Sequence, residues 1–127
     1  MEMIVTLPRG DRVEAAFDGL TVATDQDRSA PSPFELFLAS IGTCAGIYVA
    51  RFCRQRGIPT EGIRIRQKIS TNPETRLVDA IGLDIELPAG FPQEYAEAVV
   101  RSAQLCTVKK HLERPPAIEV RAVAGRP

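Results

Sequence analysis

The chain has 127 residues, enough for one globular domain that buries about two thirds of the surface its unfolded form exposes. We therefore expect a single domain over residues 1–127 that folds without a metal or a disulfide. Lysine plus arginine equals aspartate plus glutamate at 16 each, and no basic block stands out. This balance argues against binding to nucleic acid or to an anionic membrane surface.

The first residues contain no cationic stretch followed by an apolar run, so they do not resemble a secretory signal. We therefore expect a cytoplasmic protein. The chain has three cysteines, and cytoplasmic thiols stay reduced unless they are catalytic or redox-sensing. Structural disulfides are not expected.

The N-terminal region predicts a three-stranded antiparallel meander. Alternation of apolar and polar residues favours strands at 3–7, 12–17 and 20–24. A turn containing Pro8 and Gly10 separates the first two strands, and Asp18-Gly19 is typical of a tight hairpin turn. Residues 25–33 are polar, contain proline and predict a loop.

A long helix is predicted from Pro33 to about Gln55. Ser32 and Glu35 have the spacing of a capping box, with proline at the first helical position. Gly57, followed by Pro59, predicts the end of the helix.

Residues 36–50 of this helix carry no charge on any face, which predicts burial on all sides. This run is shorter than the roughly 20 residues that cross a bilayer, so a core helix is favoured over a transmembrane one. One small domain seldom surrounds such a helix. We therefore infer a homodimer, with Gly42 and Gly46 as candidate points of close approach.

The second half of the chain predicts a hairpin, a helix and a last strand. Ile63 to Ile69 and Ile81 to Leu87 alternate with cationic and anionic residues respectively, which favours their pairing. A helix from Pro92 places Cys106 on its inward stripe, and a short further turn covers 107–113. Residues 117–123 predict the last strand, so the expected order is βββ, α, ββ, α, β.

Two of the cysteines could form a reactive pair. Cys44 lies midway along the buried helix and Cys106 on the inner stripe of the next, so a dithiol is sterically possible, as is a role for both as small core residues. Cys53 follows Cys44 by nine residues and therefore lies on the opposite side of the helix. We interpret Cys53 as a core or interface residue.

A reactive buried thiol needs a group that stabilises its thiolate. Cys44 is too far into its own helix for the helix dipole to help, so an arginine is the expected activator. Arg12 and Arg9 are both candidates, and both could equally be surface charges. His111, the one histidine, lies on a charged turn, and no paired ligand spacing supports a metal site with Cys44 and Cys106. No cofactor or metal is expected.

Two segments carry a resemblance to a known family. The stretch Ser32 to Cys44, SPFELFLASIGTC, resembles the segment leading to the first cysteine of the OsmC/Ohr family. The stretch Leu105 to Leu112, LCTVKKHL, resembles the segment around its second cysteine. The separation of the cysteines and the order of elements are also similar, so the resemblance spans nearly the whole chain.

The resemblance implies an α+β fold with antiparallel sheets and a long buried central helix, assembled as an intertwined homodimer. It also implies a peroxidase in which Cys44 attacks a hydroperoxide and Cys106 resolves the sulfenic acid to a disulfide. Arg12 would stabilise the Cys44 thiolate, and an external dithiol would reduce the disulfide.

The sequence departs from the family pattern at two positions. The organic hydroperoxide branch has a glutamate directly after the proline of the first segment, where this chain has Phe34. The second segment often has proline after its cysteine, where this chain has Thr107. The Phe34 departure favours a second hypothesis, a thiol or small-ligand binding protein that keeps the fold without efficient peroxidase turnover.

Overall fold

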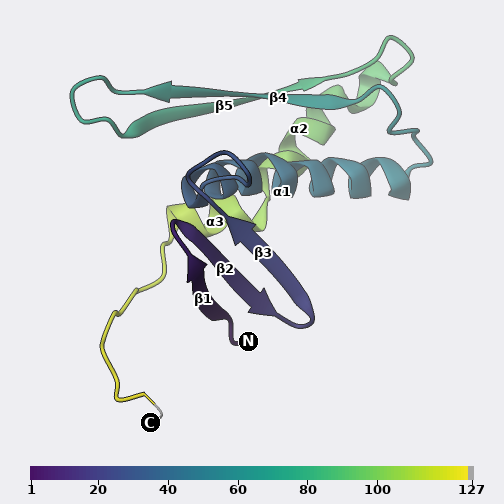
Figure 1. The fold of residues 1–127 in the computed structure, drawn as a ribbon. Helices are drawn as coiled ribbons and strands as arrows, with labels where there is room; N and C mark the ends of the chain where they lie inside the picture. Colours follow the sequence, from purple (N-terminus) through teal and green to yellow (C-terminus); the bar gives the residue numbers. More distant parts are fainter. Residues whose placement is uncertain (126–127) are drawn as a thin grey trace. The chain divides into compact units, whose positions relative to one another are not determined.

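The computed structural model describes residues 1–125 (Figure 1). The contacts within the chain divide it into two units. The first unit comprises Met1–Thr43 and Gln67–Leu83. The second unit comprises Cys44–Arg66 and the residues that follow from Asp84. Helices alternate with antiparallel sheets in an α+β arrangement, which confirms the predicted fold class. The prediction of one domain over the whole chain stays a prediction.

The first sheet is the predicted meander of β1 (Ile4–Arg9), β2 (Arg12–Phe17) and β3 (Leu20–Thr24), paired antiparallel in that order. Asp18 and Gly19 both have positive φ, 48° and 77°, as a two-residue hairpin turn requires. β1 is longer than predicted because it continues through Pro8 to Arg9, with an irregular register after Thr6. Proline is tolerated there because β1 is an edge strand.

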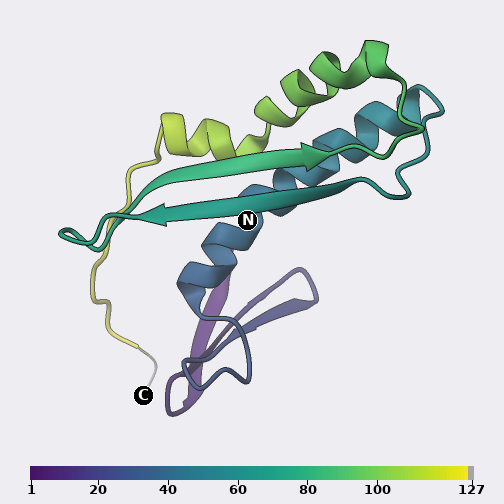
Figure 2. The same cartoon turned by 90° about the horizontal axis from the view of Figure 1, so that it is seen from above.

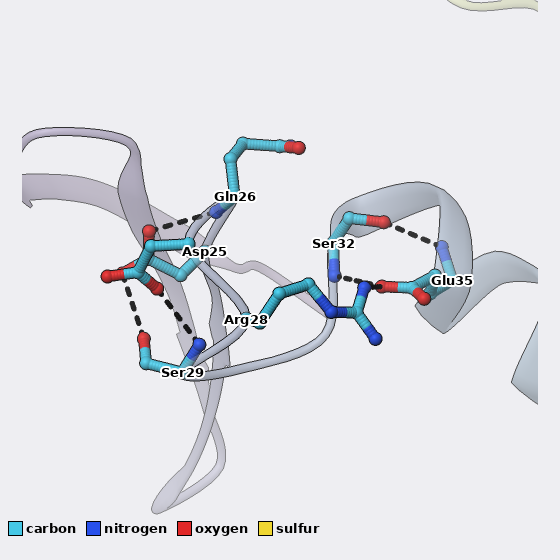
Figure 3. A network of polar contacts seen from close by, with 7 residues as sticks. Asp25, Gln26, Arg28, Ser29, Ser32 and Glu35 are labelled. Carbon is cyan, nitrogen blue, oxygen red and sulfur yellow. Dashed lines mark hydrogen bonds and ion pairs between the residues drawn. The ribbon is translucent and has the colours of Figure 1, made fainter.

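The loop after β3 is held by its own polar side chains (Figure 3). Asp25 is buried, and its carboxylate accepts hydrogen bonds from the Gln26 amide at 2.9 Å and the Ser29 hydroxyl at 3.3 Å. Arg28 has a left-handed backbone, with φ of 72°, and its Nη1 donates to Glu35 Oε1 at 2.6 Å. This ion pair ties the loop to the start of the following helix.

The long helix α1 (Pro33–Gln55) has the predicted bounds and caps. The Glu35 amide donates to Ser32 Oγ at 3.2 Å, and the Ser32 amide donates to Glu35 Oε1 at 3.0 Å, so the capping box is confirmed. At the other end Gly57 has φ of 65°, and the Ile58 amide donates to the Cys53 carbonyl at 2.9 Å. These features form a Schellman motif that ends the helix.

Burial of α1 within one chain is restricted to a stripe, so the prediction of burial on all sides is wrong for the single chain. The buried side chains recur at helical spacing and are Ile41, Ala45, Val49, Phe52 and Cys53. Other large apolar side chains of α1 stay exposed, at 53% for Phe34, 38% for Phe37 and 49% for Ile47.

The second sheet is the predicted hairpin of β4 (Arg64–Thr71) and β5 (Val78–Glu86), whose strands run side by side in both views (Figures 1 and 2). Glu86 accepts from Arg64 Nε at 2.6 Å and from Arg66 Nε at 2.8 Å, which confirms the expected pairing of opposite charges.

A close approach between β4 and α1 involves Gly42. The side-chain amide of Gln67 donates to the Leu38 carbonyl at 2.9 Å, and a Cβ added at Gly42 would collide with the side-chain oxygen of the same glutamine. Gly42 therefore makes room for a side chain of its own chain.

The C-terminal region differs from the prediction in two ways. A 3-10 turn, η1 (Gln93–Tyr95), precedes α2 (Ala96–Gln104), which ends before Cys106, and a separate helix α3 (Thr107–Glu113) follows. Residues 117–123 form no strand, because no neighbouring strand in the described chain pairs with them. Their apolar side chains are accordingly exposed, at 82% for Ile118, 92% for Val120 and 77% for Val123.

Glu35→Gln should give a stability difference that depends on pH. The ion pair with Arg28 and the Ser32 amide lower the pKa of Glu35 from 4.5 to about 2, while glutamine can still accept the capping bond. The folded state therefore favours the ionised form, so its stabilising effect is complete above 4.5 and is lost as pH falls through about 2. Wild type should be more stable than the variant at neutral pH, and the two should converge in acid.

Denaturant titrations of wild type and Glu35→Gln, from neutral pH down to about pH 2, measure this difference in stability. The matched control is Glu61→Gln, since Glu61 is exposed and has no hydrogen bond or ion pair with another described residue. If the difference in unfolding free energy between wild type and Glu35→Gln does not change with pH, the charge of Glu35 does not stabilise the fold.

Candidate functional site

The second half of α1 packs against α2 through contacts within one unit. The Ser102 hydroxyl donates to the Tyr48 carbonyl at 3.1 Å, and the rings of Phe52 and Tyr95 meet edge to face with centroids 6.0 Å apart. The phenol of Tyr48 also hydrogen-bonds the Thr107 hydroxyl at 2.9 Å. These contacts bring the beginning of α3 next to the middle of α1.

Cys106 is the N-cap of α3, and not a member of the α2 stripe as predicted. Its sulfur accepts from the Lys109 amide at 3.4 Å, and its carbonyl accepts from the Lys110 amide at 3.1 Å. The side chain is 2% exposed, so the expectation that it points inward is confirmed although the helix assignment was wrong.

Cys44 is half-buried on α1 and faces the first amides of α3. Burial raises the pKa of its thiol, but hydrogen bonds from the Val108 amide, the Cys106 side chain and the Thr107 amide lower it, as does the charge of Arg51. The lowering effects exceed the burial effect, so the pKa of Cys44 falls below the ordinary 9.0. These contacts therefore stabilise the thiolate form of Cys44 relative to that of an ordinary cysteine.

Cys106 has the opposite tendency. Burial raises the pKa of its thiol, the Lys109 amide opposes this, and the neighbouring Cys44 sulfur raises it further. The pair therefore loses its first proton from Cys44, while Cys106 stays protonated and donates to the thiolate. A thiolate beside a protonated thiol can attack an electrophilic atom and form a bond to it. The second thiol can then attack the same sulfur, displace that atom and form a disulfide.

The environment of the third cysteine, Cys53, disfavours its thiolate. Cys53 is fully buried, and burial raises the pKa of its thiol more than the charge of Arg56 lowers it. This confirms the interpretation of Cys53 as a core residue.

Two groups that act on Cys44 were not predicted from the sequence. A helix dipole was not expected to help because Cys44 is deep in α1, yet the stabilising amides belong to α3. The second group is Arg51, which follows Cys44 by seven residues and so lies on the same face of the helix. The spacing of Arg51 could have revealed it from the sequence.

The arginines proposed from the sequence lie in the other unit. Arg12 Nε donates to Glu14 at 2.8 Å within β2, and Arg9 pairs opposite Arg12 in the first hairpin. A role for Arg12 at Cys44 stays a prediction.

His111 is exposed on α3, and its Nδ1 is 2.8 Å from the Thr107 carbonyl of the preceding turn. Within residues 1–125 no three histidine, cysteine, aspartate or glutamate side chains cluster as metal ligands would.

Comparison with known proteins identifies the family. The family model described as OsmC-like protein matches residues 24–121, which is most of the chain and includes Cys44 and Cys106. The chain belongs to the OsmC-like family.

Solved structures of the OsmC-like family share this fold. A Psychrobacter arcticus protein named for osmotic stress and detoxification has a TM-score of 0.71 at 20% identity, with 85% of each chain covered. An OsmC-like protein from Mycoplasma pneumoniae has a TM-score of 0.70 at 15% identity, with 88% of this chain and 86% of that one covered. The organic hydroperoxide resistance protein OhrB of Bacillus subtilis has a TM-score of 0.54 at 17% identity, with 91% and 93% covered. None of the curated proteins compared with the chain matches it in sequence.

Membership of the family also bears on α1. By length and composition this helix of residues 33–55 could cross a membrane, a test that the core helix of a soluble protein also passes. OsmC-like proteins are soluble, and α1 is therefore interpreted as the core helix of the fold.

Thr107→Pro should raise the pKa of Cys44, because proline has no amide hydrogen to donate to the thiolate. Proline fits this first helical position, and Cys106, with φ of −54° and ψ of 135°, already has a backbone that can precede it. The pH profile of Cys44 alkylation should shift to higher pH.

Thr107→Val is the matched control, because it removes the hydroxyl bonded to Tyr48 but keeps the amide. Equal alkylation profiles for wild type and Thr107→Pro would rule out the amide as a stabilising donor.

Proposed function

We propose that this OsmC-like protein is a cysteine-based peroxidase that reduces organic or small hydroperoxides. The observation that carries the proposal is the environment of Cys44, whose sulfur faces two amide hydrogens of α3 and the thiol of Cys106. Peroxide reduction by a thiol needs a thiolate that a small molecule can reach, and Cys44 is half-buried where Cys53 is fully buried.

In the first step the Cys44 thiolate attacks the distal peroxide oxygen, the O–O bond breaks, and the alkoxide leaves and takes a proton to become the alcohol. Cys44 is oxidised to a sulfenic acid. The Cys106 thiol then attacks this sulfur, which forms the disulfide and releases water. An external dithiol reduces the disulfide through two exchange steps and is itself oxidised.

Family membership supports the reaction class. Several solved relatives are named as hydroperoxide resistance proteins, including those of Bacillus subtilis and Legionella pneumophila. The proposal includes Arg12 as a further stabiliser of the thiolate. It also includes a cytoplasmic location and assembly as a homodimer. No metal or organic cofactor has a part in this chemistry.

Brief treatment with an alkyl hydroperoxide should produce a disulfide between Cys44 and Cys106 and leave Cys53 reduced. The two bridged thiols interact directly, whereas Cys53 is fully buried with a raised pKa. Peptide mapping after alkylation measures the pairing.

Cys106→Ser provides the control, because without a resolving thiol Cys44 should accumulate as sulfenic acid and its over-oxidised products. A bridge that includes Cys53, or a reduced Cys44 under excess peroxide, would defeat the mechanism.

One observation favours a second function, which is the binding of a thiol or small ligand without efficient peroxidase turnover. At the position of the hydroperoxide branch's glutamate, Phe34 is 53% exposed and stacks on Phe37 with centroids 5.5 Å apart. Glu35 is engaged by Arg28 and by the cap of α1. Consumption of hydrogen peroxide and of an alkyl hydroperoxide with several dithiols separates the two functions, since only a peroxidase turns over repeatedly.

The protein should be a homodimer in solution at micromolar concentration. One chain leaves an uncovered apolar side on α1, including Phe37 and Ile47, and an unpaired apolar segment around Val120. A second subunit that covered both would remove this surface from water. Light scattering measures the mass, and a monomeric mass would refute the assembly but not the chemistry of the cysteine pair.

A further inference from the structure

The last turn of α2 determines where α3 starts, because only Leu105 and Cys106 separate the two helices. The Leu105 amide donates to the Ser102 carbonyl at 3.1 Å. The Cys106 amide donates to the Ala103 carbonyl at 3.4 Å. These hydrogen bonds hold the connection close to the end of α2. A contact that fixes this turn against α1 therefore also fixes Cys106 and the first amides of α3.

Ser102 makes such a contact with α1. Its hydroxyl donates to the Tyr48 carbonyl at 3.1 Å, and its side chain is half-buried. Tyr48 follows Cys44 by four residues, so it lies one turn further along the same side of the helix. Within residues 1–125 this is the one hydrogen bond that joins α1 to α2. It therefore ties the end of α2 to the turn of α1 that follows Cys44.

The direction of the Ser102 hydroxyl is not set by its own helix. Serine and threonine in helices commonly bond a carbonyl three or four residues earlier in the same helix. In α1 the Ser40 hydroxyl does so with the Phe37 carbonyl at 2.6 Å. The Thr43 hydroxyl does so with the Ala39 carbonyl at 2.8 Å. The Ser102 hydroxyl instead bonds a carbonyl 54 residues away in the sequence, so its bond is tertiary.

Other contacts near the cysteine pair restrain α2 and α3 less closely. Val99 and Ala103 are buried side chains of α2, and the burial of apolar surface has no preferred direction. The Tyr48 phenol bonds the Thr107 hydroxyl, but Thr107 is exposed and water can replace its partner. A hydrogen bond weakens steeply when its angle departs from the preferred range. The half-buried bond of Ser102 therefore restrains both the distance and the direction of α2.

We propose that Ser102 is a positioning residue that holds the end of α2, and with it Cys106 and the start of α3, against Cys44. The amides at the start of α3 stabilise the thiolate only at hydrogen-bond distance. A disulfide also needs the two Cβ atoms within about 4.5 Å of each other. A displacement of α2 along α1 would weaken both. The inference deepens the proposed function, because turnover needs this placement, but the placement itself does not depend on peroxide chemistry.

Ser102→Ala should move the pH profile of Cys44 alkylation to higher pH and slow the alkylation severalfold at neutral pH. Alanine cannot bond the Tyr48 carbonyl, so the amides of α3 are held less closely to the sulfur and stabilise its thiolate less. Labelling with iodoacetamide, followed by peptide mapping, measures Cys44 separately from the other two cysteines. Ser102→Thr keeps the hydroxyl and should restore the wild-type profile. The matched control is Ser40→Ala, which removes a hydroxyl that lies one turn before Cys44 and is bonded within α1.

A titration with reduced and oxidised glutathione gives a second measurement, the equilibrium between the two thiols and the Cys44–Cys106 disulfide. Ser102→Ala should lower the equilibrium constant for disulfide formation severalfold, whereas Ser40→Ala should leave it unchanged. If Ser102→Ala is less stable in denaturant but keeps the wild-type alkylation profile or the wild-type disulfide equilibrium, Ser102 only stabilises the fold and the proposal is overturned. An equal shift in Ser40→Ala would also overturn it. Neither measurement uses peroxide, so failure of the peroxidase function would be recognised separately.

Discussion

The chemistry of this chain depends on the contact between the Cys44 sulfur and the first amides of α3. A helix begins with amide hydrogens that have no partner inside the helix, and here those of Thr107 and Val108 point to a sulfur on another helix. The sulfur of Cys106 accepts the Lys109 amide of the same turn. One helix start thus orients both cysteines and gives them different proton affinities, which is what separates a nucleophile from a resolving thiol.

This contact could not be predicted from the sequence because it is tertiary. The position of Cys44 in the middle of α1 was predicted correctly, and from that position the dipole of its own helix is indeed no help. What stabilises the thiolate comes from a helix more than sixty residues later in the chain. Cysteine is also not among the usual capping residues, so nothing at Cys106 indicated that a helix begins there.

Local rules predicted the parts of the fold that depend on neighbouring residues. The capping box of Ser32 and Glu35, the Asp18-Gly19 turn and the glycine after α1 were found because each motif is complete within a few positions. The alternation of residues 117–123 predicted a strand by the same kind of rule, and it failed because a strand also needs a partner. Periodicity describes which face is apolar, and it does not supply the surface that covers it.

The two influences on Cys44 that come from α3 and from Arg51 differ in physical character. Amide hydrogen bonds act at contact distance and are little affected by salt, whereas the charge of Arg51 acts through space and is screened over a Debye length of about 8 Å at physiological ionic strength. Arg51 also has the smallest effect on the pKa of Cys44 of the groups that lower it. The Cys44 thiolate therefore depends mainly on the groups at the start of α3, and the charge of Arg51 makes a smaller contribution.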